Sequence, residues 1–294
     1  MAERVLELQA PAKINLCLHV GPRRGDGFHS VCSLMEKVSL FDSIRVGPSR
    51  EGMRVRGMDI PREDNIVSRA VEALERETGK VFSIDIEIGK EIPMAAGLAG
   101  GSSDAAAVMR AVDCLAGLGL TSERLSTVAA EVGADVPFFV TEGPQLAAGA
   151  GELLEAADGL AGYHIALAVP DAELSTARVY RLFDEAGGVS GPDFRRRCME
   201  LKASLGEAGG LDGMVSLLYN DLESVASALV PEIGRIKDTL LELGAAGALM
   251  SGSGPSVFGL FAAAGEASAA AAALRRTGLR AWAAAPLRPP APSA

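Results

Sequence analysis

The sequence predicts a protein of the mixed α/β class, because strand patterns and helix patterns follow one another along the whole chain. Apolar and polar residues alternate over 82–88, which is the pattern of a strand with one buried face. A glycine-rich loop comes next, and a stripe of valine and leucine then predicts a helix over about 105–115. The second half shows the same mixture, with an apolar strand at 164–169 and a helix at 176–186.

The length of 294 residues is enough for two domains of moderate size. Strands and helices are predicted on both sides of a boundary between residues 150 and 160. We therefore expect an N-terminal domain over residues 1–155 and a C-terminal domain over residues 156–294.

Local signals place the remaining elements. Residues 14–18 alternate and predict a strand near the start of the chain. Asp64 or Asn65 can cap a helix that runs to about Glu77 and is stopped by Gly79. The proline-rich tail over 286–294 is expected to be loosely held. The same criteria predict helices at 122–132, 211–229, 231–243 and 264–276 and strands at 257–261 and 280–284.

Composition excludes several classes of protein. Hydrophobic residues make up 48% of the chain, which is too many for a disordered protein. The net charge of −10 disfavours binding to nucleic acid or to an anionic membrane, and no apolar run reaches the roughly 18 residues of a membrane span. Four cysteines without a Cys-x-x-Cys pair fit free thiols in a reducing compartment, so we expect a cytoplasmic protein.

The loop between residues 93 and 103 is the strongest functional signal. Its glycines let the backbone come close to a ligand, and the following helix start offers unpaired N–H donors and a partial positive charge. These features favour a phosphate-binding loop, although an ordinary turn capped by Ser103 or Asp104 would give the same pattern. The candidate phosphate-binding residues are Pro93, Met94, Ala95, Ala96, Gly97, Leu98, Ala99, Gly100, Gly101, Ser102 and Ser103.

A second glycine cluster covers residues 249–256 and precedes an apolar strand. A tight turn explains it, and a second wall of the same site is the functional alternative. Gly252 and Ser253 are the candidate contacts in this cluster. Lys90 lies close to the first loop in sequence, and it is a further candidate for neutralising an anionic ligand.

Lys13 and Asp135 are candidates for chemistry. Lys13 and Asn15 fall on the polar face of a predicted strand, where a solvated surface is the simpler interpretation. Asp135 precedes an apolar run and could be a plain helix cap. The catalytic alternative is a carboxylate that orients or deprotonates a hydroxyl, with a nearby lysine keeping it ionised.

Phe28 and His29 end a basic loop, and such a pair could stack on and hydrogen-bond a heterocyclic base. A structural histidine at a strand start is equally compatible with the pattern. The chain has only three histidines, which leaves little room for a histidine-based metal cluster. It also lacks the Gly-x-Ser-x-Gly motif of serine hydrolases.

Taken in order, these pieces resemble the GHMP family of small-molecule kinases. Pro-Ala-Lys at 11–13, the loop at 93–103 and the loop at 251–256 look like the three motifs of that family. A finer pattern is similar to the branch that phosphorylates 4-diphosphocytidyl-2-C-methyl-D-erythritol in non-mevalonate isoprenoid biosynthesis. That pattern combines Pro-Ala-Lys-Ile-Asn-Leu, Arg-Gly-Asp-Gly-Phe-His, Gly-Ala-Asp-Val-Pro-Phe-Phe and Asn-Asp-Leu-Glu.

The resemblance implies a two-lobed α/β fold of the α+β two-layer type. Its N-terminal domain would be related to domain 2 of ribosomal protein S5, and its C-terminal domain would be ferredoxin-like. ATP with Mg²⁺ would donate the γ-phosphoryl group to the C2 hydroxyl of the substrate, and the enzyme would be a monomer or a homodimer.

The resemblance also implies roles for single residues. Asp135 would orient the hydroxyl and accept its proton, and Lys13 would keep Asp135 anionic. Asn15 would contact the substrate beside Lys13. The cytosine would stack on Phe28 and hydrogen-bond to His29, and Tyr180 would form the second aromatic face.

Two departures from the family pattern stand out. Phe28 replaces the usual tyrosine, so stacking remains but a hydroxyl contact is lost. Ala95, Ala96 and Ala99 replace glycines in the phosphate loop, and their Cβ atoms predict a different loop path. The alternatives are another GHMP kinase, of the mevalonate or homoserine type, and a catalytically silent binding protein with the same fold.

Overall fold

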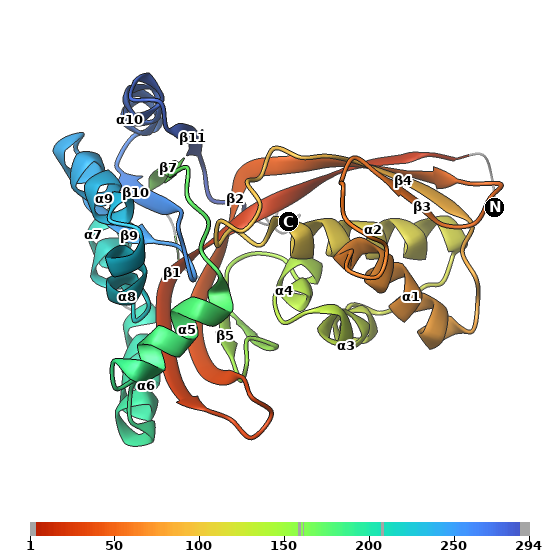
Figure 1. The fold of residues 1–294 in the computed structure, drawn as a ribbon, viewed down its shortest axis with the longest axis horizontal. Coiled ribbons are helices and arrows are strands. Elements are labelled where there is room, and N and C mark those ends of the chain that lie inside the picture. The colour runs from red at the N-terminus through yellow and green to blue at the C-terminus, as the bar shows by residue number, and fades with distance from the viewer. Residues whose placement is uncertain (1–3, 158–159, 161, 207–208, 289–294) are drawn as a thin grey trace, which may run out of the picture. The chain divides into compact units, whose positions relative to one another are not determined.

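A computed structural model describes residues 4–157, 160, 162–206 and 209–288 and has a mixed α/β architecture (Figure 1). The chain forms two compact units, and each is discontinuous in sequence. Unit 1 contains Met1–Ala12, Leu40–Met94 and Ala99–Glu142, and unit 2 contains Lys13–Ser39, Ala95–Leu98 and Gly143–Ala294. Strands β1 (Leu6–Arg23) and β2 (His29–Pro48) contribute residues to both units.

Within unit 1, β2 pairs antiparallel with β4 (Ile84–Gly89), with Ile44 opposite Ile88 and Val46 opposite Ile86. The short strand β3 (Arg54–Arg56) lies parallel to β4 on its other side. The predicted strand at 82–88 is thus confirmed as β4, although it begins two residues later.

Both β1 and β2 are longer than the alternation of apolar and polar residues predicts. β1 has 18 residues, and from Lys13 to Val20 every residue is buried. Strand β2 also buries the charged side chains of Glu36, Lys37 and Asp42. A strand that is buried on both faces and carries polar residues has no period-2 hydrophobic pattern, which is why the sequence hid most of their length.

Four helices of unit 1 pack against one another on one face of this sheet (Figure 1). The side chain of Asn65 accepts a hydrogen bond from the Val67 N–H at 2.9 Å and caps α1 (Ile66–Thr78), which ends at Gly79 as predicted. Thr121 caps α3 (Ser122–Val132) in the same way. The other two helices are α2 (Gly100–Ala116) and α4 (Val136–Val140).

The predicted start of the helix at 105 is wrong, because α2 begins at Gly100. Its first turn is formed by two glycines and two serines, which have low helix propensity in isolation. Burial of Gly100 and Ser103 holds this turn in helical form.

Unit 2 contains a four-stranded antiparallel sheet in the order β11-β7-β10-β9. Helices α9 (Glu232–Glu242) and α10 (Ala264–Arg276) pack on it. The four strands are β7 (His164–Val169), β9 (Gly247–Met250), β10 (Val257–Phe261) and β11 (Arg280–Ala284). The remaining elements of unit 2 are β5 (Gln145–Ala148), β6 (Leu153–Ala156), α5 (Thr176–Glu185), α6 (Gly191–Leu205), α7 (Gly210–Ser216), β8 (Tyr219–Asn220) and α8 (Glu223–Leu229).

The predicted single helix at 211–229 is wrong. The structure has α7 and α8 there, separated by β8, which pairs in parallel with β1. The Asn220 side chain donates to the carbonyl oxygens of Met250 and Gly252, each at 2.8 Å, and accepts from the Leu222 N–H. These long-range bonds stabilise a break that local apolar spacing does not reveal.

The end of the chain is only partly described. Pro286 bridges to Val38 on β2, and the Leu287 N–H donates to the Lys37 carbonyl at 2.8 Å. The start of the tail is therefore fixed rather than loose, whereas residues 289–294 lie outside the described part. All four cysteines are free thiols, and no helix among the described residues is long and apolar enough to span a membrane.

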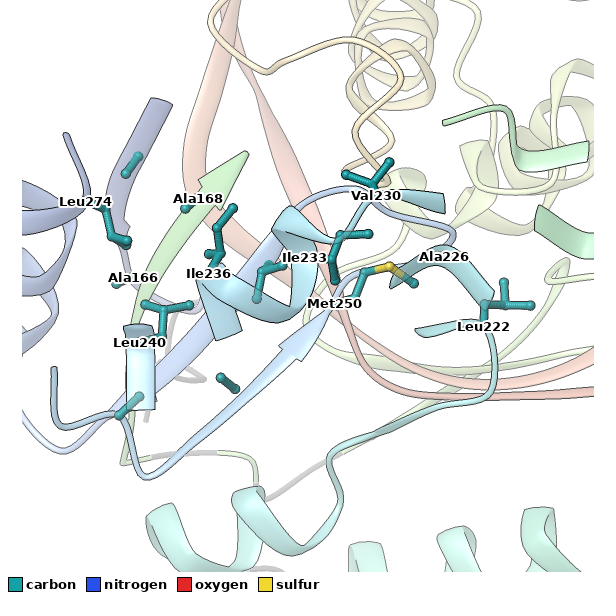
Figure 2. Close-up of a cluster of buried hydrophobic side chains, with 14 of the residues drawn as sticks. Ala166, Ala168, Leu222, Ala226, Val230, Ile233, Ile236, Leu240, Met250 and Leu274 are labelled. Atoms are coloured by element: carbon teal, nitrogen blue, oxygen red, sulfur yellow. The ribbon is translucent and has the colours of Figure 1, made fainter. Parts of the chain in front are cut away.

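Figure 2 shows the main core of unit 2, where α9 packs its apolar face against β9 and β10. Ile233, Ile236 and Leu240 project from α9 at helical spacing. Ala166 and Ala168 of β7 belong to the same buried cluster.

Leu240→Ala should lower the free energy of unfolding by about 2–5 kcal/mol, because it leaves a cavity at a fully buried site. Urea denaturation followed by circular dichroism measures the loss. The control is Leu241→Ala on the same helix, where the side chain is 43% exposed and the loss should be much smaller. Equal losses would contradict this account of the core.

Candidate active site

The predicted phosphate loop connects β4 to α2 and ends in an open helix start. Ala99 occupies the N-cap position of α2 and makes no side-chain capping bond. The first-turn N–H groups of this 17-residue helix can therefore be satisfied by a bound anion, which the helix dipole also favours. The alternative of a turn capped by Ser103 or Asp104 does not hold, since both lie inside the helix.

The alanines that depart from the family pattern adopt strained backbone angles. Ala95 has a φ of 52° and Ala99 a φ of 53°, and no other non-glycine residue among those described has a positive φ. A left-handed conformation costs an L-residue about 1–2 kcal/mol. Both alanines thus hold a backbone conformation that glycine would favour, and the expectation of a different loop path stays a prediction.

A buried ion network holds both ends of the loop within unit 1. Asp42 Oδ1 accepts the Glu91 and Ile92 N–H groups at 2.7 and 2.8 Å, just before the loop. The Lys90 ammonium lies 2.5 Å from Asp42 Oδ2 and 2.8 Å from Asp104 Oδ2, just after it. A single lysine therefore connects the strand end to the first turns of α2.

This network changes the assignment of Lys90. Both carboxylates are fully buried and the Lys90 side chain is 17% exposed, so its charge is already neutralised. The prediction that Lys90 neutralises a ligand is therefore wrong, and its role is structural. Burial disfavours its charged form, but Asp104 and Asp42 outweigh burial, and the pKa of Lys90 is raised.

Two carboxylates share this one ammonium. Burial raises the pKa of Asp104 to about 7, and the negative charge of Asp42 adds to the rise, while Lys90 opposes it. Folding therefore binds a proton at Asp104 when the pH lies between about 4 and 7.

Lys13 and Asn15 form the centre of the site in unit 2. Both are on β1 and are only 5% and 4% exposed, so the interpretation as a solvated strand face is wrong. The Lys13 ammonium donates to Asn15 Oδ1 at 2.5 Å. The Lys13 backbone N–H donates to the Leu98 carbonyl of the phosphate loop at 3.1 Å, which fixes strand and loop together.

The second glycine loop packs against this pair. The Ser251 hydroxyl accepts the Asn15 N–H at 3.2 Å and donates to the Gly97 carbonyl at 3.1 Å. A Cβ on Gly97 would sit 2.3 Å from the Ser251 carbonyl oxygen, so no side chain fits there. The two loops thus come together beside Lys13, as the second-wall interpretation expected.

Gly252 is constrained as well, although less tightly. Its φ is 58°, and a Cβ would lie 3.2 Å from the Gly97 carbonyl oxygen and 3.5 Å from Lys13 Nζ. Its carbonyl accepts the bond from Asn220. Ser253 is anchored separately, because its hydroxyl hydrogen-bonds to the Thr176 hydroxyl at 2.8 Å.

Asp135 lies at the N-cap position of α4 in unit 1, where its side chain makes no capping bond. The plain-cap interpretation therefore fails, and the half-buried carboxylate is left for another role. Its position relative to Lys13 remains a prediction.

The predicted base-binding residues lie together in unit 2. Phe28 is 63% exposed, and the His29 ring centroid lies 5.1 Å from that of Tyr180 on α5. His29 Nδ1 lies 2.9 Å from the Gly21 carbonyl, which can only accept, so Nδ1 carries the proton. His29 Nε2 then faces Asp184 at 3.3 Å. Asp184 has no counterpart in the sequence motifs, because its relation to His29 arises from tertiary packing.

Comparisons with known proteins define the class. The model of the GHMP kinase N-terminal domain matches residues 65–143, and the model of the GHMP kinase C-terminal domain matches residues 197–279. A solved homoserine kinase from Cytophaga hutchinsonii matches 98% of this chain and 97% of its own with a TM-score of 0.78. At 19% identity it shows the fold alone.

Full-length relatives narrow the assignment. A 4-diphosphocytidyl-2-C-methyl-D-erythritol kinase of Syntrophotalea carbinolica is 44% identical over 95% of this chain and 98% of its own length. The corresponding kinase of Geobacter metallireducens is 45% identical over 90% of this chain and 92% of its own. A crystal structure of a 4-(cytidine 5'-diphospho)-2C-methyl-D-erythritol kinase is 35% identical, with a TM-score of 0.77 over 95% of this chain and 98% of its own. The chain belongs to the GHMP kinases and, within them, to the family of 4-diphosphocytidyl-2-C-methyl-D-erythritol kinases.

Gly252→Ala should reduce turnover about 100-fold, because the added methyl group must displace the backbone beside Lys13 and Asn15. Steady-state kinetics with ATP measures the loss. The control is Gly244→Ala, which has the same type of backbone strain at a φ of 95° but no atom within 4 Å of its Cβ. Similar turnover in both variants would contradict the constraint at Gly252.

The stability of the protein should fall, relative to Asp104→Asn, as the pH rises from about 4 to about 7. Asp104 is protonated more readily in the folded state, so ionisation in this window favours unfolding. Urea titrations at a series of pH values measure the slope for both proteins, and Asp113→Asn on the same helix is the control. If the free energy of unfolding changed with pH in the same way in the natural chain and in Asp104→Asn, the raised pKa of Asp104 would be disproved.

Proposed function

We propose that the protein transfers the γ-phosphoryl group of ATP to the C2 hydroxyl of 4-diphosphocytidyl-2-C-methyl-D-erythritol. The relatives named for this activity support it, since they match nearly the whole chain at 38–45% identity. The observation that carries the mechanism is the buried Lys13–Asn15 pair beside two glycine-lined loops.

Positioning and charge neutralisation supply most of the rate enhancement in phosphoryl transfer. The phosphate loop would hold the ATP phosphates through the backbone N–H groups at the start of α2. Asp135 would orient the acceptor hydroxyl and take its proton, and the Lys13 ammonium would stabilise negative charge on Asp135 and on the transferred group. This requires both side chains to meet at one hydroxyl.

The residues present fit a magnesium ion that arrives with the nucleotide. Among the described residues, no three His, Cys, Asp or Glu side chains form a metal-binding group. Magnesium often keeps its waters and uses one or two protein ligands. The Ser103 Oγ next to the loop is buried without a hydrogen-bond partner and is the candidate protein oxygen. When bound, the ion would neutralise charge on the phosphates.

Recognition of the cytosine would rest on Phe28, His29 and Tyr180. Phe28 is exposed and could stack on the base, and His29 lies beside Tyr180 with its Nε2 3.3 Å from Asp184 Oδ2. Mevalonate and homoserine carry no heterocyclic base. The group of Phe28, His29 and Tyr180 therefore favours the cytidine substrate over the substrates of those GHMP kinases.

The division into residues 1–155 and 156–294 remains a proposal. The two matching family models fall on opposite sides of it, at residues 65–143 and 197–279. The association state, monomer or homodimer, and the cytoplasmic location are part of the same proposal.

Asp135→Asn should lower turnover about 10²–10⁴-fold while leaving ATP affinity largely intact, because the amide cannot accept the hydroxyl proton. Coupled-enzyme kinetics gives the turnover, and fluorescence titration with an ATP analogue gives the affinity. Equal turnover in the variant and an active natural chain would remove Asp135 from the mechanism. An inactive natural chain that still binds ATP would favour a silent binding protein.

The substrate is tested with the natural chain alone. We expect phosphorylation of 4-diphosphocytidyl-2-C-methyl-D-erythritol and none of mevalonate or homoserine. Phosphorylation of either of the latter two alone would overturn the substrate assignment but leave the kinase class standing.

A further inference from the structure

We propose that Ser33 is a positioning residue for phosphoryl transfer, because its hydroxyl determines which end of the Asn15 amide faces the Lys13 ammonium. The inference rests on the role of Lys13 in the proposed function. Ser33 belongs to none of the sequence motifs. It lies on β2, and its side chain is 2% exposed.

Two short hydrogen bonds define the position of Ser33. Its hydroxyl donates to the Cys17 carbonyl oxygen at 2.7 Å. The same oxygen accepts a hydrogen bond from Asn15 Nδ2 at 2.7 Å. All of these residues, together with Lys13, belong to unit 2.

The direction of these bonds follows from the atoms present. A carbonyl oxygen can only accept, so the single hydroxyl proton of Ser33 must point at Cys17. Only lone pairs of the Ser33 oxygen then face the amide of Asn15. The amide must turn its NH₂ group toward Ser33, and its carbonyl oxygen must face the opposite way.

That orientation is the one the ammonium needs. Lys13 Nζ has donors only, and it lies 2.5 Å from Asn15 Oδ1. The reversed amide would place an NH₂ group against the ammonium, with donors facing donors. The Lys13 ammonium and the Ser33 oxygen therefore favour the same orientation, and Ser33 holds the amide at its NH₂ end.

Apart from Ser33 and Lys13 itself, the contacts around Asn15 hold the backbone and not the amide. The Asn15 N–H is held by Ser251, and the Lys13 N–H is held by Leu98. Without the Ser33 hydroxyl these bonds would remain, and the amide would be held at its oxygen alone. The effect should therefore appear in the chemical step rather than in nucleotide binding.

The experiment compares Ser33→Ala, Ser33→Thr and the control Ser39→Ala in the full chain. Ser39 is on the same strand and accepts one hydrogen bond, from the Ala285 N–H at 2.9 Å. Ser33→Ala should lower kcat about 10–100-fold, with the KM values changed less than about twofold. Ser33→Thr retains the hydroxyl and should recover most of the activity, and Ser39→Ala should keep normal kcat.

Thermodynamic coupling separates positioning from a merely structural role. Because Ser33 acts through Asn15, adding Ser33→Ala to Asn15→Ala should cause little further loss of kcat. A full additional loss in the double variant, or equal kcat in Ser33→Ala and the natural chain, would overturn the proposal.

A measurement without substrate distinguishes this inference from the proposed function. In protein labelled with ¹⁵N-lysine, the Lys13 Nζ signal, assigned through Lys13→Arg, should shift in Ser33→Ala but not in Ser39→Ala. An unmoved signal in Ser33→Ala would disprove the positioning role even if the enzyme phosphorylates the expected substrate. A shifted signal in a chain that phosphorylates another alcohol would overturn the substrate and leave the role of Ser33 intact.

Discussion

The ammonium group of Lys13 is buried, and this constraint shapes the structure around it. A charged group in the interior requires hydrogen-bond acceptors, because it has lost its water. Asn15 Oδ1 is one of them, and the amide of Asn15 is in turn oriented by Ser33. The strand that carries Lys13 must therefore be polar where a structural strand would be apolar.

The same constraint explains the glycines of the two loops. The backbone at Gly97 passes so close to the Ser251 carbonyl that even a methyl group would collide, and Gly252 approaches Lys13 and Asn15 in the same way. In unit 2, main-chain atoms of the two loops thus lie next to Lys13. In unit 1, the backbone N–H groups at the start of α2 are donors without the flexibility or the charge of a lysine.

Unit 1 contains a network of buried charge on either side of the phosphate loop. Asp42, Lys90 and Asp104 connect the residues before and after the phosphate loop, and two carboxylates sharing one ammonium leave Asp104 with a raised pKa. These bonds hold Glu91 and Ile92 before the loop and Asp104 after it.

The sequence by itself determined the class of the fold, the end of α1 at Gly79, the elements β7, α5, α9, β10, α10 and β11 of the second half, and the motif residues from which the site is predicted. These features depend on neighbours in the chain, through hydrophobic period, capping side chains and glycine spacing. Tertiary structure alone decided the full length of β1 and β2, the early start of α2, the break between α7 and α8, and the roles of Lys90 and Ser33. Each of these depends on a partner distant in sequence, such as Asp42 for Lys90 or Met250 for Asn220, and a local pattern carries no information about a distant partner.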